Sequence, residues 1–189
     1  MPRKALTVGA ALAVLGVAVL PAQAEAMPAI GPVIRATAAQ ADTLRFSLRE
    51  RDVERSFRFN DADRSGSNTV GDSASGRIEL LKGRRVVGGV RYTTTIVAQQ
   101  GPTTWLLRSR DVVTIRRQRS ARGGHLFTQY EHTEDFNRVP QVGDVQVITV
   151  VRGDGRFAGY TGEIRSRVVK VQRGQPQFVS SFNLVRQGS

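Results

Sequence analysis

Few side chains in this 189-residue sequence could carry chemistry, and the carboxyl of Glu131 is the main candidate. Glu131 follows Tyr130 in a strand-like segment that is rich in Thr, Phe and His. A carboxyl that faces an apolar interior has a raised pKa and can act as a general acid near neutral pH. If its side of the strand faces inward, Glu131 is therefore the candidate catalytic residue. The alternative is that Glu131 points outward and pairs with a neighbouring Arg.

Five aromatic residues could form the walls of an apolar binding site around such a carboxyl. They are Tyr92, Trp105, Tyr130, Phe178 and Phe182. Sites for small molecules are mostly apolar, with a few polar groups that orient the ligand, and the two tyrosines would supply such groups. The alternative is that these side chains fill a solid core. Strand register decides between the two, because a slip of one residue exchanges the faces of a strand.

Other kinds of site have little support in the sequence. There is no Cys, which excludes disulfides, Cys-ligated zinc and thiol nucleophiles. His125 and His132 are seven residues apart in one strand-like segment, so they face opposite sides and cannot bind one metal together. Neither a nucleophile elbow nor a phosphate-binding loop is present. We therefore expect neither a metal nor an organic cofactor in the site.

Residues 61–72 form the strongest candidate for a metal-binding loop elsewhere in the chain. Residues 61–66 (DADRSG) resemble the beginning of a calcium loop, and Asp72 supplies an acid at the twelfth position. Asn68, however, stands where such loops usually have an aliphatic residue, and no helical pattern flanks the segment. The alternative is a polar hairpin loop built from Asp, Asn and Gly.

The chain is strongly basic, with 28 Lys and Arg against 16 Asp and Glu and a formal net charge of +12. This balance favours contact with anions but does not bear on the fold. The densest basic cluster, between Arg108 and Arg122, contains no aromatic residue on which a base could stack. We therefore expect a solvated basic face and no nucleic-acid partner.

The elements that must position these residues are β-strands. From residue 42 onward, segments rich in Val, Ile, Thr, Phe and Tyr alternate with Gly, Asp, Asn and Pro, and none shows a 3.6-residue apolar period. We predict nine strands, at residues 43–50, 53–59, 74–82, 85–99, 103–119, 124–134, 144–152, 162–173 and 176–186. Alternation with both faces largely apolar, as in 145–151 and 178–185, favours a closed barrel or a sandwich.

The beginning of the sequence resembles a targeting segment. Residues 1–26 combine a basic start, the apolar run Ala5–Leu20 and small residues two apart, which are the three parts of a signal peptide. The apolar run is too short to span a bilayer as a helix. Residues 27–41 have the composition of a flexible lead-in. We predict a secreted or cell-envelope protein with a β-barrel domain at 42–189 and no integral membrane segment after cleavage.

Several short motifs follow one another in an informative order. Residues 153–162 (GDGRFAGYTG) form a glycine-rich turn, residues 68–72 (NTVGD) precede a strand, and residues 80–90 form a hairpin with Gly83, Gly88 and Gly89. In type, order and spacing these motifs resemble those of the allene oxide cyclase-like and dirigent-like superfamily. Residues 50–52 (ERD) also resemble the acidic stretch after the first strand of plant allene oxide cyclases. The resemblance covers about residues 43–186.

The resemblance implies an all-β fold, namely an antiparallel closed barrel of about eight strands with an apolar lumen. It also implies a homo-oligomer, because such barrels often form dimers or trimers. Within the glycine-rich turn, Gly155, Gly159 and Gly162 are expected to be structural. Glycine supplies positive φ and lets the backbone pass close to a neighbouring strand.

Members of the superfamily bind or cyclise small apolar molecules. The resemblance, together with the predicted signal peptide, therefore implies a secreted barrel that binds a small hydrophobic molecule and guides its cyclisation or isomerisation. Any such cyclase or isomerase lacks the plant allene oxide cyclase residues, because Ser47 stands where the plant enzymes have a catalytic Glu. Gly76, Ile78 and Arg55-Ser56 depart from the plant pattern in the same way. The alternative is a non-catalytic interaction protein of the cell envelope that uses its basic surface.

Overall fold

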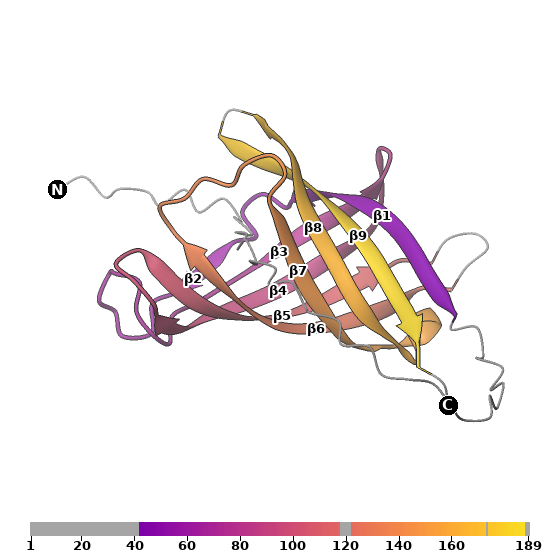
Figure 1. Cartoon of the computed structure of the whole chain (residues 1–189), viewed down its shortest axis with the longest axis horizontal. Coiled ribbons are helices and arrows are strands. Elements are labelled where there is room, and N and C mark those ends of the chain that lie inside the picture. The colour runs from indigo at the N-terminus through magenta and orange to yellow at the C-terminus, as the bar shows by residue number, and fades with distance from the viewer. Residues whose placement is uncertain (1–41, 118–121, 173, 188–189) are drawn as a thin grey trace, which may run out of the picture.

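The computed structural model describes residues 42–117, 122–172 and 174–187, and this part of the chain is built of β-strands (Figure 1). The strands are β1 (Thr43–Asp52), β2 (Arg58–Asn60), β3 (Ser73–Lys82), β4 (Arg85–Gln99), β5 (Thr104–Ile115), β6 (Gly124–Asp135), β7 (Val145–Gly153), β8 (Tyr160–Gln172) and β9 (Gln175–Arg186). The helical element in these ranges is the short 3-10 turn η1 (Gly155–Phe157). None of the described residues forms a helix long and apolar enough to cross a bilayer. The predicted signal peptide and lead-in, residues 1–41, lie outside the described residues.

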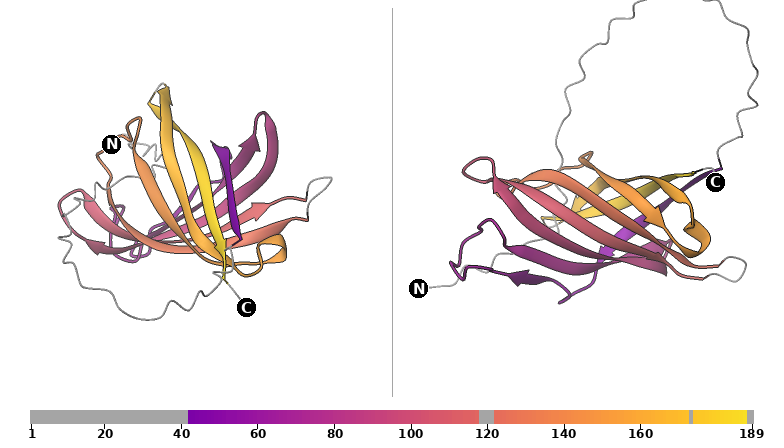
Figure 2. Two further views of the ribbon diagram at one scale, coloured as in Figure 1. Left: turned by 45° about the vertical axis from the view of Figure 1, so that its right-hand side comes forward. Right: turned by 90° about the horizontal axis from the view of Figure 1, so that it is seen from below.

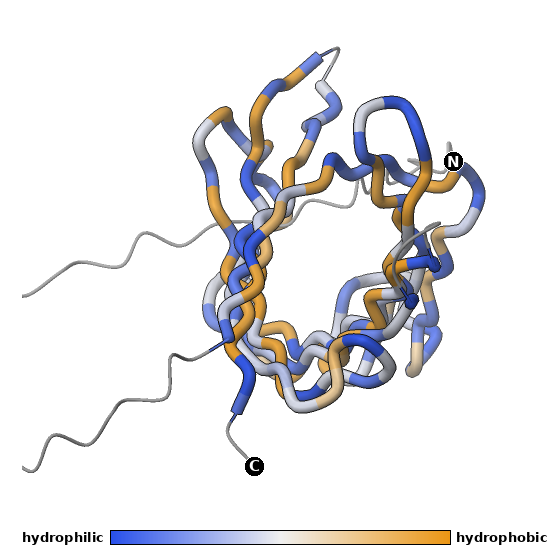
Figure 3. The backbone as a smooth tube through the Cα atoms, turned by 90° about the vertical axis from the view of Figure 1, so that its right-hand side faces the viewer, coloured by the Kyte–Doolittle hydropathy of each residue, from blue (hydrophilic) through white to orange (hydrophobic). Residues whose placement is uncertain are grey.

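Eight of the strands close into an antiparallel barrel. Each strand from β3 to β9 pairs with its neighbours in the sequence, and β1 pairs with β9 on one side. On its other side, residues 49–52 of β1 pair with residues 78–81 of β3, which closes the sheet on itself. β2 adds a short ninth strand beside residues 73–75 of β3. Figure 2 shows this tube from two further directions, and Figure 3 looks along it.

The prediction of an all-β closed barrel is confirmed, and most strands begin and end within a few residues of the predicted positions. Residues 53–59 are an exception, because only Arg58–Asn60 form a strand. The chain remains in β1 as far as Asp52, since this end of β1 pairs with β3. It then turns at Arg55, whose φ of 58° is incompatible with an extended strand.

The barrel interior contains two apolar clusters. In one of them, Phe157 of η1 is fully buried among Leu, Ile and Val side chains, and its ring centroid lies 6.5 Å from that of Phe46. Ile96, Trp105 and Leu107 form a second, smaller buried cluster. Full burial of each such side chain contributes roughly 1.5–3 kcal/mol. The interior between these two clusters is where polar side chains face inward.

Candidate functional site

A band of polar side chains lines the barrel interior between the two apolar clusters. On β5 the inward-facing residues alternate with exposed ones, and Ser109 and Asp111 are buried among Leu107, Val113 and Ile115. Cross-strand partners point to the same face of a sheet. Following the ladders around the barrel therefore identifies the other members. The polar band consists of Glu50, Tyr92, Thr94, Ser109, Asp111, Thr128, Tyr130, Gln146, Ser166 and Ser180.

Glu50 is the first of two carboxyls in the polar band. Ser166 Oγ donates a hydrogen bond to Glu50 Oε1 at 2.7 Å, and Ser180 Oγ donates to the same oxygen. Burial raises the pKa of Glu50, while the two serine hydrogen bonds oppose the rise and the charge of Asp52 adds to it. The neutral form of this carboxyl is therefore easier to reach than that of an exposed Glu.

Asp111 is the second carboxyl, and it is 6% exposed. Burial raises its pKa to about 6, hydrogen bonding with Thr128 and Tyr130 opposes the rise, and the charge of Glu50 adds to it. The two carboxyls therefore act on each other electrostatically within one lumen. A group with a pKa of about 6 is suited to donate or accept a proton near neutral pH.

Tyr92 and Tyr130 lie on the strands on either side of Asp111. Burial raises the pKa of Tyr92 to about 12, and the charges of Asp52 and Asp111 add to this effect. Burial also raises the pKa of Tyr130 well above its ordinary value, and the charge of Asp111 contributes. Both hydroxyls therefore keep their protons at neutral pH and remain hydrogen-bond donors.

The position of the Tyr92 ring depends on a glycine. Gly76 is the cross-strand partner of Tyr92 on β3. A Cβ atom at Gly76 would lie only 2.6 Å from Cζ of Tyr92. The ring therefore occupies the space that any other residue at position 76 would fill.

Several buried polar atoms in the lumen have no hydrogen-bond partner among the described residues. They are Asp111 Oδ1, Nε2 and Oε1 of Gln146, and Nδ1 of His132. Gln146 is only 4% exposed, so bulk water does not reach it freely. An unsatisfied buried polar atom is costly, and ordered water or a polar group of a ligand removes that cost. The polar band therefore offers hydrogen-bonding positions to a bound molecule.

A line of proton-carrying side chains leads from the polar band toward the Trp105 end of the lumen. The rings of Tyr130 and His132 stack with centroids 5.4 Å apart. His132 Nε2 lies 3.8 Å from Glu134 Oε2, and both side chains are mostly buried. Tyr130, His132 and Glu134 are two residues apart along β6, so all three side chains lie on its inward face.

The five aromatic residues predicted to line the site all face the interior. Trp105, Phe178 and Phe182 are buried, and Tyr92 and Tyr130 belong to the polar band. Phe182 also stacks on Phe46 with ring centroids 4.4 Å apart and belongs to the apolar cluster. The tyrosines thus lie beside the carboxyls, whereas Phe182 packs in the core.

Glu131 does not face the lumen. Its side chain is 46% exposed on the outer face, and its Oε1 lies 2.8 Å from Arg108 Nη2. Tyr130 and His132 face inward, so alternation along β6 turns Glu131 outward. The carboxyls of the polar band are Glu50 and Asp111, and neither was predicted as a site residue. The sequence does contain a signal for Asp111. It lies an even number of residues from Leu107, Val113 and Ile115, so it shares the apolar face of its strand with them.

The acidic loop at 61–72 forms a separate cluster. Carboxylate oxygens of Asp61, Asp63 and Asp72 lie within 4.8 Å of one another. Asp72 accepts hydrogen bonds at 2.8 Å from the backbone amides of Ala62 and Thr69. Asp61 likewise accepts hydrogen bonds from the backbone amides of Ser65 and Gly66. These hydrogen bonds hold the carboxylates of Asp61 and Asp72 in place within the loop.

Comparison with known proteins supports the fold. No protein-family model matches the chain, and no curated protein matches it in sequence. Pyocyanin demethylase is similar in structure, with 13% identity over 72% of this chain and 98% of that chain and a TM-score of 0.52. The pterocarpan synthase dirigent protein GePTS1 has 12% identity over 84% and 97% of the two chains and a TM-score of 0.55.

A third similar structure is AbnU, an exo-specific intermolecular Diels-Alderase. It has 19% identity over 76% of this chain and 98% of its own, with a TM-score of 0.50. At these low identities the likeness concerns the fold alone. The predicted resemblance to dirigent-like barrels is confirmed at that level.

Proposed function

We propose that this barrel binds a small, largely apolar molecule in its lumen and guides the cyclisation or isomerisation of that molecule. One observation carries the proposal: Glu50 and Asp111, two carboxyls with raised pKa, share a barrel interior with two apolar clusters. A solid structural core rarely contains two such groups. Pairs of carboxyls with raised pKa are typical of sites that move protons.

The chemistry follows from the protonation states. Protonated Asp111 donates its proton to a basic oxygen of the bound molecule, and the Tyr92 and Tyr130 hydroxyls donate hydrogen bonds to the same region. The carboxylate of Asp111 or Glu50 then accepts the proton that is lost when the new double bond or ring forms. One proton is given and one is taken, so the reaction needs no oxidant or other co-reactant.

The two apolar clusters of the lumen contribute by shape. A flexible chain held between them has its reacting ends close together, and such proximity accelerates ring closure. The similar structures support this part of the proposal, because AbnU is a Diels-Alderase and a Diels–Alder reaction forms a ring. No residue role is transferred from them, since the identities lie between 12% and 19%.

The proposal is tested by thermal unfolding in the presence of linoleic acid, coniferyl alcohol and a linear polyketide acid. A ligand at 100 times its Kd stabilises the folded protein by about 2.7 kcal/mol. Ser180→Leu fills the lumen at the polar band and should abolish the stabilisation. Ser181→Leu, one residue later on the outer face of β9, is the matched control and should retain it.

Two results would contradict the proposal. One is that no compound raises the melting temperature of the wild-type protein. The other is that the stabilisation persists in Ser180→Leu. If anionic polymers bind while no apolar molecule does, the function is instead that of a non-catalytic protein with a basic interaction surface.

A further inference from the structure

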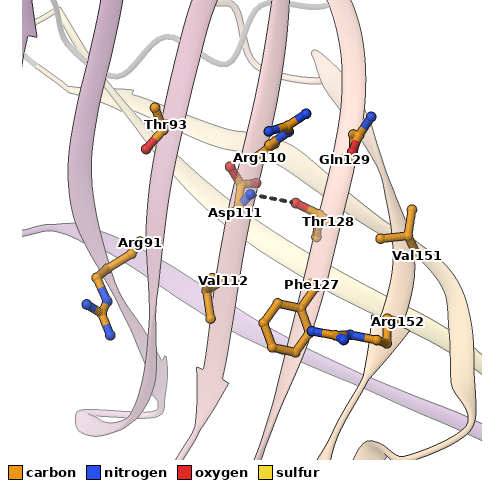
Figure 4. Close-up of a pocket in the computed structure, with 10 residues that line it drawn as sticks. All are labelled: Arg91, Thr93, Arg110, Asp111, Val112, Phe127, Thr128, Gln129, Val151 and Arg152. Atoms are coloured by element: carbon orange, nitrogen blue, oxygen red, sulfur yellow. Dashed lines mark hydrogen bonds between the residues drawn. The ribbon is translucent and has the colours of Figure 1, made fainter.

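We infer that the outer face of β4–β7 carries a second binding site, for a small molecule with two acidic groups on a flat apolar body. This face has a hollow of about 820 Å³, on the outside of the wall whose inner side bears Asp111 (Figure 4). Its main features are three arginines, Arg91, Arg110 and Arg152, and an apolar floor formed by Val112 and Phe127.

Strand pairing arranges these residues in rows across the sheet. Arg91, Val112, Phe127 and Arg152 are successive cross-strand partners on β4, β5, β6 and β7. Adjacent strands are about 4.8 Å apart, so the Cα atoms of Arg91 and Arg152 lie roughly 14 Å apart, with Val112 and Phe127 on the two strands between them. Arg110 stands in the next row, two residues from Val112 on β5. The hollow thus has cationic groups around an apolar centre.

These three arginines, Arg91, Arg110 and Arg152, form no salt bridge within the part of the chain that the structure describes. Arg152 instead lies over the Phe127 ring, with its guanidinium carbon 4.3 Å from the centroid (Figure 4). Asp154, whose carboxylate interacts electrostatically with Arg152, is hydrogen-bonded to the backbone N and Nδ1 of His125 at 2.8 and 2.9 Å.

A further arginine makes the binding of an anion at the hollow more favourable. Arg77 on β3 is the direct cross-strand partner of Arg91, and both side chains are exposed. Like charges directly opposite each other destabilise a β-ladder. An anion bound at this edge of the hollow would relieve that repulsion. The row beyond Arg110 is different, because Arg108 already pairs with Glu131 and so ends the basic region.

These features select the chemistry of the ligand. Guanidinium groups bind carboxylate or phosphate through paired, charge-assisted hydrogen bonds. The volume lies in the range of pockets that bind small molecules. Arginines on opposite sides of an apolar floor suit a dianion with a flat apolar body. A long anionic polymer fits less well, because the Arg108–Glu131 ion pair interrupts the positive charge.

The test compares naphthalene-2,6-dicarboxylate with its neutral dimethyl ester, by isothermal titration calorimetry on the whole protein. We expect saturable binding of the dianion and binding of the ester at least tenfold weaker. Arg91→Gln and Arg152→Gln should each weaken binding of the dianion by about tenfold, which is the loss of one charge-assisted contact. Arg167→Gln removes the same charge from the exposed outer face of β8 and should leave the Kd within twofold of the wild-type value.

Three results would overturn the inference. They are the absence of saturable dianion binding, an equal loss in Arg167→Gln, and equal binding of the ester. Ser180→Leu separates this site from the lumen, because filling the lumen should leave dianion binding intact. Failure of the lumen proposal would therefore not affect this result, and failure of the outer site would not affect the lumen.

Discussion

Tyr92 and Asp111 stand directly opposite each other across the β4–β5 ladder, and both side chains face the lumen. Burial is the main cause of the raised pKa of each group, and the negative charge of Asp111 further raises the pKa of Tyr92. The tyrosine therefore stays neutral, while the aspartic acid titrates at about 6. The pair combines a permanent hydrogen-bond donor with a group that gains and loses a proton near neutral pH.

The raised pKa of Asp111 predicts how stability depends on pH. An unfolded Asp titrates near 3.9, so between about pH 4 and pH 6 the folded protein binds more protons than the unfolded chain. The free energy of unfolding therefore falls as pH rises through this window, by up to about 3 kcal/mol. Asp111→Asn removes this contribution. Urea unfolding should show it to be more stable than the wild type above pH 6, by roughly 1–3 kcal/mol, and similar below pH 4.

Glu131→Gln is the control for this prediction. Glu131 forms an exposed ion pair with Arg108, and such pairs contribute about 0–1 kcal/mol. Its pH profile should therefore keep the wild-type slope between pH 4 and pH 6. Identical slopes in the wild type and Asp111→Asn would show that Asp111 has no raised pKa.

Gly76 is predicted to matter because of the Tyr92 ring. A methyl group at position 76 would overlap that ring, so Gly76→Ala should destabilise the protein by about 1–3 kcal/mol. When the ring is removed by Tyr92→Ala, Gly76→Ala should reduce the free energy of unfolding much less. A double-mutant cycle of unfolding free energies measures this coupling. Additive effects of the two substitutions would mean that the ring does not lie over Gly76.

The glycine-rich turn contains three glycines with positive φ, namely Gly155 at 56°, Gly159 at 80° and Gly162 at 140°. A Cβ at Gly162 would clash with the Asn183 carbonyl oxygen and lie 3.1 Å from Cα of Leu184, whereas one at Gly159 would meet nothing closer than 3.8 Å. Replacing either Gly159 or Gly162 by Val forces a non-glycine residue into positive φ, with backbone strain of about 1–3 kcal/mol. Gly162→Val should therefore lower the melting temperature more than Gly159→Val. Equal melting temperatures for the two variants would argue against a close strand contact at Gly162.

The resemblance of residues 1–26 to a signal peptide predicts export. A basic start, an apolar run and small residues two apart occur in order within residues 1–26, so the exported protein should begin at Glu25 or Met27. Intact mass spectrometry of the protein recovered outside the cytoplasm measures this directly. Recovery of the uncleaved chain in the membrane fraction would refute the prediction.

Much of the fold was predictable because its signals are local. Gly, Pro, Asp and Asn mark the turns, and β-branched and aromatic residues mark the strands between them. The order and spacing of the short motifs then pointed to the fold of the dirigent-like barrels. The segment 53–59 was mispredicted because β1 continues to Asp52 through pairing with β3, which is a contact between distant parts of the chain.

The candidate site was less predictable because it depends on register around the whole barrel. The side chains that hold Glu50 come from Ser166 and Ser180, more than one hundred residues later in the chain. Alternation on β5 indicates that Asp111 faces inward, but its raised pKa also depends on Glu50, from another part of the barrel. The sequence favoured Glu131 as the catalytic residue because its carboxyl is next to Tyr130 in the chain. Its outward position follows from the same alternation that turns Tyr130 inward.

The central claim is that Glu50 and Asp111 hold the bound molecule inside the barrel. The most direct measurement is the affinity of the tightest-binding compound of the apolar panel for the wild type, Glu50→Gln, Asp111→Asn and Glu131→Gln. We predict that Glu50→Gln and Asp111→Asn each weaken binding about tenfold or more, the value of one buried hydrogen bond to a charged or polar partner. Glu131→Gln should bind as the wild type does. Unchanged affinity in Glu50→Gln and Asp111→Asn, or a loss confined to Glu131→Gln, would contradict the account.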